Sequence, residues 1–463
     1  MLIPRLLIAG THSGVGKTTL ATGVMAALAN QGYRVQGFKV GPDYIDPGYH
    51  ALATGRAPRN LDVWLLGEDQ VARQFVRGAQ GADLAIVEGV MGLFDGIQAT
   101  RGVGSSAHVA RLLRLPVILV IDGSGQARSA AALVHGFATF DPTIDLVGVI
   151  INQTRSRAHC QGLKTAIEEE VGLPVLGTVP LDQELNLAER HLGLIPAVER
   201  GCRGEDNRAY IKHLGQMVSE HLALDQLVAL AEAAPALDLG PSEELPVTPC
   251  FNVSLAVARD ESFHFYYQDA LETLETLGAR LVEFSPLKDE VLPAGVDGLY
   301  IGGGFPEMFI VELTRNVRLM ESIRRFWAMG KPIYAECGGL MYLCERIIDL
   351  NGDTHAGVGL VPAISRMTER LAGLGYREGR LLRSTVIGEP GTVVRGHEFH
   401  YSVVDYHDQS PAYQLYTATG EKRSVEGYAK GHLLASYLHL NFAGNPQLAD
   451  NFLRWCAAGP AGT

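Results

Sequence analysis

The stretch Leu6–Thr19, LLIAGTHSGVGKTT, decides the fold class of the first half of this chain. Its apolar start predicts a buried strand, and its glycines predict a loop whose backbone N–H groups turn toward a phosphate. An amphipathic helix follows, and its N-terminal dipole adds to the attraction for an anion. In this pattern Lys17 reaches the β- and γ-phosphates of a nucleotide, and the Thr18 hydroxyl holds Mg²⁺.

The loop departs from the usual GxxxxGK[ST] spacing at one place. That spacing requires glycine at position 11, where this chain has Thr11 and carries Gly10 one residue earlier. The alternative is a glycine-rich turn with a chance GKT, but a strand before the loop and a helix after it favour the phosphate loop. The predicted nucleotide contacts are therefore Thr11, Gly14, Gly16, Lys17, Thr18 and Thr19.

The first half of the chain repeats one pattern from residue 5 to about 225. Short apolar runs alternate with amphipathic helical segments, which predicts a mostly parallel sheet with helices on both faces. Residues 231–249 are rich in Ala, Pro and Glu and lack periodicity, so they are predicted to be a linker. The expected strands are Leu6–Ala9, Val35–Val40, Leu84–Val87, Pro116–Ile121, Leu146–Ile151 and Val175–Val179.

The pattern restarts after the linker, so we predict domains at residues 1–230 and 250–463. The second domain is expected to be another α/β unit with antiparallel additions in its tail. Its expected helix is Tyr267–Leu277, and its expected strands are Val253–Ala258, Ala279–Phe284, Gly298–Ile301, Pro332–Ala335, Thr392–Arg395 and Ser436–Leu440.

The overall composition excludes some classes of protein. The 463 residues include 39 Lys and Arg against 51 Asp and Glu, a net charge of −12 that argues against a general nucleic-acid binder. Hydrophobic residues make up 47%, as in globular proteins, and no apolar run is long enough to span a membrane. The N-terminus is too short for a signal peptide. Six cysteines without a CxxC pair fit a reducing cytoplasm, so we expect a cytoplasmic protein.

Carboxylates for the metal are expected where strands end. Glu88 ends the run LAIVE, although it is alternatively a residue that only caps a turn. Asp43 and Asp46 lie in KVGPDYIDPG, at the carboxyl edge of the sheet where ligands bind. We assign Asp43 and Glu88 to the metal with Thr18. Asp46 and Lys39 are assigned to the substrate, although Asp46-Pro47 also suits a simple turn.

Three further polar residues are candidate ligand contacts in the first domain. Asn152 follows the run GVII, and its amide is suited to paired hydrogen bonds with an adenine. Arg190 and His191 add positive charge in a loop that suits a polyanionic substrate. The alternatives are an asparagine that only shapes a turn and a basic loop without a ligand.

The second domain carries a candidate nucleophile, Cys337. The segment KPIYAECGGLMY reads as strand, sharp turn and helix, with the cysteine at the turn. A thiol at a helix N-terminus has a lowered pKa, which favours the nucleophilic thiolate. The alternative is a buried cysteine that only packs. His439 in SYLHLN is the predicted base, and Gly303 and Gly304 in YIGGGFPE are the predicted oxyanion-hole donors.

Together these motifs resemble the cobyrinic acid a,c-diamide synthase family, corrin-pathway glutamine amidotransferases with a dethiobiotin-synthetase-like phosphate-loop domain. The related cobyric acid synthases share both domains, but the loop GPDYIDP and the run RNLDVWL are similar to the a,c-diamide branch. The resemblance covers nearly the whole chain and rests on GTHSGVGKTT (10–19), KVGPDYIDPGYH (39–50), RNLDVWL (59–65), VEGVMGLFDG (87–96), RHLGL (190–194), YIGGGFPE (300–307), AECGGLMYL (335–343) and RGHEFHYS (395–402).

The resemblance implies a phosphate-loop domain joined to a class I glutamine amidotransferase domain, and a reaction in cobalamin biosynthesis. ATP with Mg²⁺ would phosphorylate the c and a carboxylates of cobyrinic acid, a polycarboxylate tetrapyrrole. Cys337 would release ammonia from glutamine, and the ammonia would displace the phosphate. Such an enzyme is a carbon–nitrogen ligase. Its partners are these substrates, without nucleic acid or membrane, and a homodimer is left open.

The chain departs from many class I glutamine amidotransferases beside the predicted base. Those enzymes carry Glu two residues after the histidine, whereas this chain has Asn441 there. The corrin branch is similar in lacking that Glu. The group that orients His439 is therefore open at this stage, and Glu398 in the cluster RGHEFHYS is our candidate.

Other functions stay open on the sequence alone. The same chemistry suits hydrogenobyrinic acid or nickel-sirohydrochlorin. A different class is a partition-protein-like ATPase switch without amidotransfer, which would leave Cys337 idle. A third is a plain glutaminase with a vestigial nucleotide site, in which Lys17 would be dispensable.

Overall fold

A computed structural model describes residues 2–97, 102–181, 206–237 and 250–459. The chain divides into two compact units, Met1–Ser242 and Glu243–Thr463, and each is described by itself. The division falls within the predicted linker, residues 231–249. Residues up to Leu237 nevertheless pack on the first unit, because Leu237 is buried and Arg5 Nη2 donates to the Pro235 carbonyl over 2.5 Å. The bounds of the linker stay a prediction.

The first unit is built on one seven-stranded sheet. Its strand order is β3-β2-β4-β1-β5-β6-β7, and every neighbouring pair is parallel. All six strands expected from the sequence are present, and β3 is an additional short one. The strands are β1 (Arg5–Gly10), β2 (Val35–Val40), β3 (Arg59–Leu61), β4 (Leu84–Glu88), β5 (Val117–Asp122), β6 (Leu146–Thr154) and β7 (Val175–Pro180).

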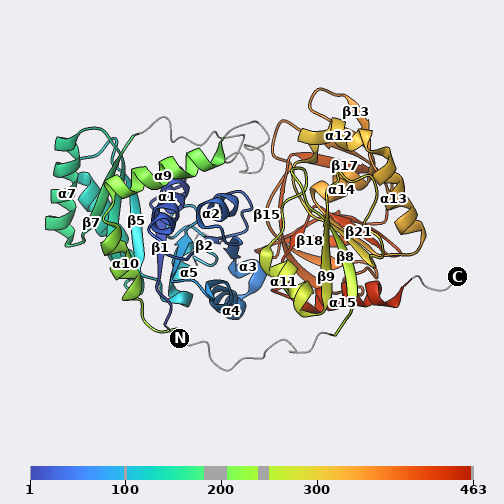
Figure 1. Ribbon diagram of the computed structural model, residues 1–463, viewed down its shortest axis with the longest axis horizontal. Helices are drawn as coiled ribbons and strands as arrows, with labels where there is room; N and C mark the ends of the chain where they lie inside the picture. Colours follow the sequence, from blue (N-terminus) through green and yellow to red (C-terminus); the bar gives the residue numbers. More distant parts are fainter. Residues whose placement is uncertain (1, 98–101, 182–205, 238–249, 460–463) are drawn as a thin grey trace. The chain divides into compact units, whose positions relative to one another are not determined.

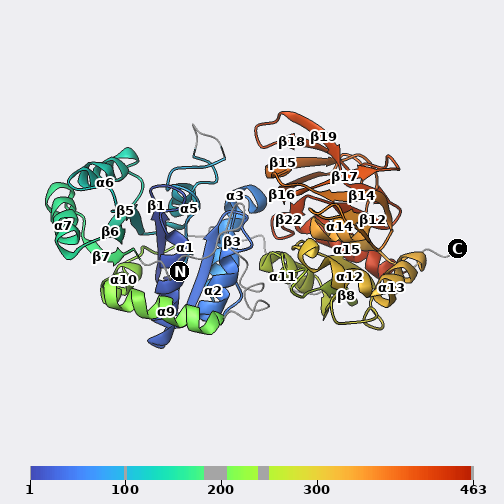
Figure 2. The same ribbon diagram turned by 90° about the horizontal axis from the view of Figure 1, so that it is seen from above.

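Helices cover both faces of this sheet, as predicted (Figure 2). The buried residues of α1, α9 and α10 form one core with the face that carries Leu6 and Ile8. On the opposite face, Phe75 of α4 packs on Phe38 with ring centroids 4.9 Å apart. The helices are α1 (Lys17–Asn30), α2 (Asp46–Thr54), α3 (Val63–Leu66), α4 (Glu68–Ala79), α5 (Ser106–Leu113), α6 (Ser129–Phe140), α7 (Arg157–Val171), α9 (Asn207–His221) and α10 (Leu224–Glu232).

The second unit has its own α/β layer, visible in Figure 1 around β8 and β21. Its sheet has the order β20-β21-β11-β10-β8-β9, and all pairs are parallel except β20 with β21. Helices α11 and α15 pack together, and α15 also contacts β8 and β10. The strands are β8 (Val253–Ala258), β9 (Ala279–Phe284), β10 (Gly298–Ile301), β11 (Ile333–Glu336), β20 (Tyr428–Lys430) and β21 (Leu433–Ser436).

Within residues 250–459, six helical segments accompany this layer. Residues from α12, α13 and α14 share one buried cluster with β10 and β11, so these helices pack on the sheet. They are α11 (Gln268–Thr276), η1 (Pro306–Phe309), α12 (Ile310–Arg315), α13 (Val317–Ala328), α14 (Gly338–Leu343) and α15 (Pro446–Ala458). Across both units, none of the helices in the described residues is long and apolar enough to cross a membrane.

The tail of the second unit forms two further sheets, mostly antiparallel, as its alternating sequence predicted. Their orders are β13-β12-β14-β17 and β19-β18-β15-β16-β22. The strands are β12 (Cys344–Ile348), β13 (Thr354–Ala356), β14 (Val361–Met367), β15 (Gly373–Leu381), β16 (Val393–His400), β17 (Ser402–Tyr406), β18 (Tyr413–Thr417), β19 (Lys422–Glu426) and β22 (His439–Leu440).

One expected strand was wrong. The run Ser436–Leu440 is divided between β21 and β22, which belong to different sheets. The chain turns between them because the Ser436 hydroxyl accepts from the Leu438 N–H over 2.9 Å, and Glu426 accepts from the Tyr437 N–H over 2.7 Å. A half-buried carboxylate from another strand, β19, therefore ends β21, which no local pattern of apolar residues indicates.

Candidate nucleotide site and candidate glutamine site

The loop between β1 and α1 has the shape of a phosphate cradle. Gly14 and Gly16 take φ values of 83° and 95°, which a side chain would strain, and α1 begins directly at Lys17. Lys17 folds back over the loop and donates from Nζ to the His12 carbonyl over 3.0 Å. Burial and the nearby charge of Lys39 lower the pKa of Lys17 to about 8, although neighbouring carboxylates raise it. The loop thus presents an amine and a helix N-terminus to an anion.

A cluster of buried charges lies beside this loop. Thr18 donates from its hydroxyl to Glu88 over 2.6 Å and to Asp46 over 3.2 Å. Lys39 Nζ bridges the same two carboxylates, at 2.6 Å from Asp46 and 2.7 Å from Glu88. The sequence motifs around residues 18, 39, 46 and 88 therefore meet at one point of the sheet edge.

The charges in this cluster depend on one another. Burial by itself would raise the pKa of Glu88, but Lys39 and His50 outweigh it and hold that pKa below its usual value. Burial and the neighbouring Asp43 raise the pKa of Asp46 well above normal. Burial by itself would lower the pKa of Lys39, but the carboxylates of Asp46, Glu88 and Asp43 more than offset it and raise that pKa. Lys39 is only 4% exposed, so its charge is already balanced within the protein.

Sequence reasoning missed His50 as a member of this cluster. It lies on α2, and its Nε2 is 2.6 Å from the second oxygen of Glu88. Its position in DPGYH, one turn of helix after the carboxylate loop, was the available signal.

The loop between β2 and α2 is fixed by its own side chains. Asp43 accepts from the backbone N–H groups of Ile45 and Asp46, so it caps the start of α2. Asn60, from the run RNLDVWL, donates to the carbonyls of Gly41 and Asp43 over 2.9 and 2.7 Å. Through these two hydrogen bonds, that run holds the backbone of the loop in place.

The oxygen atoms of this cluster fit a Mg²⁺ ion in the company of a nucleotide. Hydroxyl and carboxylate oxygens are the ligands that Mg²⁺ prefers, and it usually completes its shell with phosphate oxygens and water. Among the residues that the structure describes, no three His, Cys, Asp or Glu side chains are arranged to hold a metal alone. Thr18, Glu88 and the adjacent acids therefore suit an ion that arrives with phosphates.

The other predicted contacts of the first unit fall into two groups. Asn152 donates from Nδ2 to the Val15 carbonyl over 2.9 Å, so it supports the phosphate loop, and its amide oxygen remains for a ligand. A side chain at Gly16 would collide with this amide, which explains the glycine there. Arg190 and His191 lie outside the described residues.

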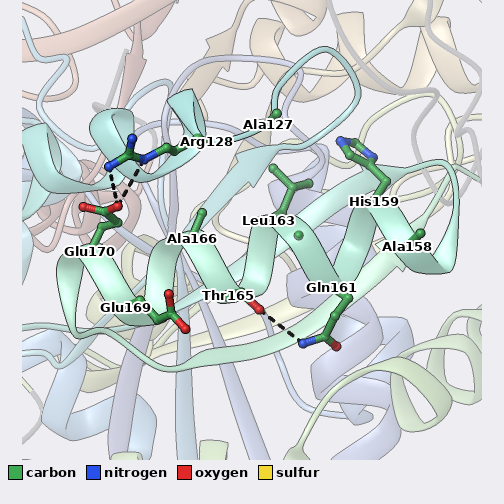
Figure 3. A pocket seen from close by; sticks show the side chains of 11 residues that line it. Ala127, Arg128, Ala158, His159, Gln161, Leu163, Thr165, Ala166, Glu169 and Glu170 are labelled. Atoms are coloured by element: carbon green, nitrogen blue, oxygen red, sulfur yellow. Dashed lines mark hydrogen bonds and ion pairs between the residues drawn. The ribbon is translucent and has the colours of Figure 1, made fainter.

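A separate hollow of about 710 Å³ lies along α7, next to the start of α6. Figure 3 shows Leu163 and Ala166 among the residues that line it, with the ion pair between Arg128 and Glu170. It shares no lining residue with the phosphate loop or the carboxylate cluster, so we do not assign it to the nucleotide.

Cys337 stands at a sharp turn between β11 and α14, as predicted. Its φ of 48° and ψ of −104° are strained for a residue with a side chain. The turn is held because the Cys337 N–H donates to the Ser436 carbonyl over 2.7 Å. Such a turn places the sulfur ahead of a helix N-terminus, which is the geometry of a nucleophile elbow, and Cys337 itself is buried.

His439 lies beside this thiol on β22 and is 1% exposed. Burial by itself would lower the pKa of His439, but Cys337 and Glu336 more than offset it and raise that pKa to about 10. The imidazole of His439 is therefore protonated near pH 7 and places a positive charge beside Cys337.

The predicted oxyanion glycines lie next to both residues. A Cβ on Gly303 would be 2.5 Å from Cε1 of His439, and a Cβ on Gly338 would be 3.2 Å from the Gly304 nitrogen. The Gly303 carbonyl accepts from the N–H groups of His264 and Phe265, which fixes the orientation of this loop. Only glycine leaves room for the histidine and the elbow to approach this closely.

The carboxylate nearest to the His439 ring is Glu336, which sequence reasoning missed. Its Oε2 lies 3.8 Å from His439 Nδ1. Glu398, our candidate for orienting His439, forms an ion pair with Arg377 Nε over 2.6 Å, and its part in orienting the ring stays a prediction. The position of Glu336 directly before the cysteine gave no signal, since the turn at Cys337 sets where its side chain points.

Two family models match the two units. Residues 6–195 match the CobQ/CobB/MinD/ParA nucleotide binding domain, and residues 254–447 match the CobB/CobQ-like glutamine amidotransferase domain. With the phosphate loop and the cysteine elbow, these matches define a glutamine-dependent amidotransferase that carries its own nucleotide-binding domain. It is an enzyme of the ligase class.

Curated relatives narrow this class to one family. Cobyrinate a,c-diamide synthase of Priestia megaterium is 44% identical, over 98% of this chain and 97% of that protein. The enzymes of that name from Dehalococcoides mccartyi strain CBDB1 and Streptococcus sanguinis strain SK36 are each 43% identical, over 98% and 97% of this chain and 98% of each relative. The chain belongs to the cobyrinate a,c-diamide synthase family.

Proposed function

We propose that this enzyme amidates the c and a carboxylates of cobyrinic acid, with ATP and glutamine as co-substrates. The observation that carries the proposal is that one chain holds both a phosphate-loop charge cluster and a cysteine–histidine pair. The first suits the activation of a carboxylate and the second suits the release of ammonia. The names of the relatives supply the macrocycle.

The first half-reaction takes place at the phosphate loop. A carboxylate is a poor electrophile, so a macrocycle carboxylate oxygen attacks the γ-phosphorus of ATP, ADP leaves, and an acyl phosphate forms. Thr11, Gly14, Gly16, Lys17 and Thr19 hold the nucleotide phosphates, and Asn152 contacts the base. Thr18, Asp43 and Glu88 would hold Mg²⁺, which neutralises phosphate charge when bound. Lys39, Asp46, Arg190 and His191 contact the macrocycle.

The second half-reaction takes place at the elbow. Cys337 attacks the side-chain carbonyl carbon of glutamine, and the N–H groups of Gly303 and Gly304 stabilise the oxyanion. The C–N bond breaks as His439 donates a proton to the leaving amine, which leaves a glutamyl thioester. Water hydrolyses the thioester to glutamate. The ammonia displaces phosphate from the acyl phosphate and forms the amide.

The test is an assay with ATP, Mg²⁺, glutamine and one macrocycle at a time, followed by product mass. Two mass steps on cobyrinic acid, each a hydroxyl-to-amine exchange, support the proposal. Preferred turnover of hydrogenobyrinic acid or nickel-sirohydrochlorin would instead identify that macrocycle as the substrate. ATP hydrolysis without any amidated product and without glutaminase activity would instead favour the ATPase switch.

Two further features belong to this proposal. The enzyme acts in the cytoplasm, in keeping with its few cysteines and soluble substrates. A homodimer is the assembly that size-exclusion chromatography with light scattering would check.

A further inference from the structure

The side chain of Glu336 is enclosed between the elbow and the histidine strand, with 1% of its surface exposed. Its Oε1 accepts from the Tyr334 hydroxyl over 2.6 Å and from the Leu440 N–H over 3.0 Å. Its Oε2 accepts from the Tyr300 hydroxyl over 3.0 Å and faces His439 Nδ1 at 3.8 Å. The carboxylate thus accepts from three buried donors and has His439 as its ion-pair partner.

The residue at the usual place of a third triad member does not serve the histidine. Asn441 turns its Oδ1 to the Ala443 N–H over 3.1 Å, which caps the following turn. Because Asn441 carries a neutral amide, the residue two positions after His439 supplies no negative charge to the imidazole. Among the described residues, the carboxylate that forms an ion pair with His439 comes from β11 instead.

We propose that Glu336 is the positioning residue of the glutamine site, taking the place of the missing third carboxylate by approaching Nδ1 of His439 from the strand that carries the nucleophile. This inference rests on the proposed glutaminase function of Cys337. At 3.8 Å, beyond hydrogen-bond distance, the carboxylate acts through its charge and favours a proton on Nδ1. It leaves Nε2 as the nitrogen that exchanges a proton with the thiol and the leaving amine.

Two tyrosines keep this carboxylate available. The hydroxyls of Tyr300 and Tyr334 are fully buried donors, and the same carboxylate raises the pKa of both well above normal, after burial as the main cause. They therefore stay protonated and donate to Glu336 at any working pH. The Leu440 N–H fixes the backbone of β22 to the same oxygen, so the histidine and its carboxylate are held as one unit.

The other titratable neighbours of His439 do not replace Glu336. Burial lowers the pKa of His397 to about 3 and that of His400 to about 4, so both are neutral near pH 7. Glu398 is neutralised by Arg377. The groups that face His439 are thus Glu336 and Cys337 from the elbow and His397, Glu398 and His400 from β16.

The test compares Glu336→Gln with Asp349→Asn. Asp349 also forms a carboxylate–histidine pair, 3.1 Å from His355 Nε2, but it lies in the turn between β12 and β13 and not beside His439. We expect Glu336→Gln to lower the kcat of glutaminase by roughly 10²- to 10⁴-fold at an unchanged KM for glutamine. Asp349→Asn is expected to leave kcat within about threefold of the wild type.

A second measurement separates positioning from a merely structural role. Iodoacetamide alkylation of Cys337 reports the thiolate, which the imidazolium stabilises. In Glu336→Gln the imidazolium loses its counter-charge and its pKa falls, so the limb of the alkylation profile that reports imidazolium deprotonation should move to lower pH by about one pH unit. In Asp349→Asn the limb should stay in place.

The outcomes separate the two proposals. If Glu336→Gln keeps the glutaminase activity of the wild type and its alkylation profile does not shift, the positioning role of Glu336 is overturned and the proposed function is not affected. A wild-type enzyme without glutaminase activity overturns the proposed function itself. If Glu336→Gln does not fold, Tyr334→Phe removes one donor to the carboxylate. A kcat about 3- to 10-fold lower at constant KM then supports the role, and an unchanged kcat contradicts it.

Discussion

Lys39 Nζ lies 2.7 Å from Oε1 of Glu88, and both side chains are almost completely withdrawn from water. The two residues are paired through adjacent strands, because Lys39 and Glu88 are register partners in the parallel pair of β2 and β4. A buried pair of this kind adds little net stability by itself, but the loss of one partner leaves an uncompensated charge. The pair therefore holds Glu88 ionised at the phosphate loop.

The first prediction concerns this pair. Lys39→Met leaves Asp46 and Glu88 without their shared cation, so we expect the unit to lose about 3–5 kcal/mol. Its Tm should fall by roughly 6–20 °C in differential scanning calorimetry. The double variant Lys39→Met with Glu88→Gln should lose less than the sum of the two single losses.

The control for this measurement is Arg34→Met. Arg34 also forms a short ion pair, 2.6 Å from Asp83, but its side chain is 65% exposed. Exposed pairs contribute little, so its Tm should stay at the wild-type value. Equal losses in both variants would contradict the importance of burial.

The second prediction concerns the division of labour between the two units. Cys337→Ser should lower glutamine-dependent amidation by at least roughly 10³-fold, since a hydroxyl is a far weaker nucleophile at this site. Amidation driven by added ammonium chloride should stay within about twofold of the wild type. Product mass spectrometry with each nitrogen source measures both. Loss of the ammonium-driven reaction as well would count against separate activation of nitrogen and carboxylate.

The third prediction concerns the charge of Lys17. Its pKa of about 8 in the free protein means that it is charged below pH 8 and increasingly neutral above. A triphosphate favours the charged amine, so ATP binding should raise this pKa and take up about half a proton at pH 8. The affinity for ATP should accordingly weaken as the pH rises beyond 8.

Calorimetric titration of ATP in two buffers of different ionisation enthalpy measures this uptake. Lys17→Arg is the matched variant, because an arginine keeps its charge throughout this range. It should bind ATP without the proton uptake at pH 8. The same uptake in both proteins would assign the proton to another group.

The fourth prediction concerns the space beside the histidine. Gly303→Ala places a methyl group 2.5 Å from Cε1 of His439, so the ring must move. A displacement of this size should lower glutaminase activity by roughly 10- to 100-fold. Gly162→Ala adds the same methyl where nothing lies within 4 Å, and it should leave glutaminase unchanged. Wild-type activity of Gly303→Ala would show that the ring has room to shift without cost.

Local patterns were sufficient for most of the fold. The apolar runs predicted every strand of the first sheet except β3, because a strand buried on both faces needs continuous apolar residues. Glycine spacing predicted the phosphate loop and the turn at Cys337, because only certain backbone angles are available there. The prediction of one strand over Ser436–Leu440 failed, because the group that ends β21 is Glu426, which comes from another strand.

The sequence by itself determined the chemistry: a phosphate loop, acids at strand ends, a cysteine at a sharp turn and a histidine on a strand, since each depends on short-range backbone geometry and residue type. Only the tertiary structure decided how these groups are paired. It brings His50 and Lys39 to Glu88. It also brings Glu336 to His439, where the sequence has Asn441 in place of the usual glutamate. Such pairings depend on strand register and on the high cost of an unpaired buried charge. Neither can be read from the spacing of neighbouring residues.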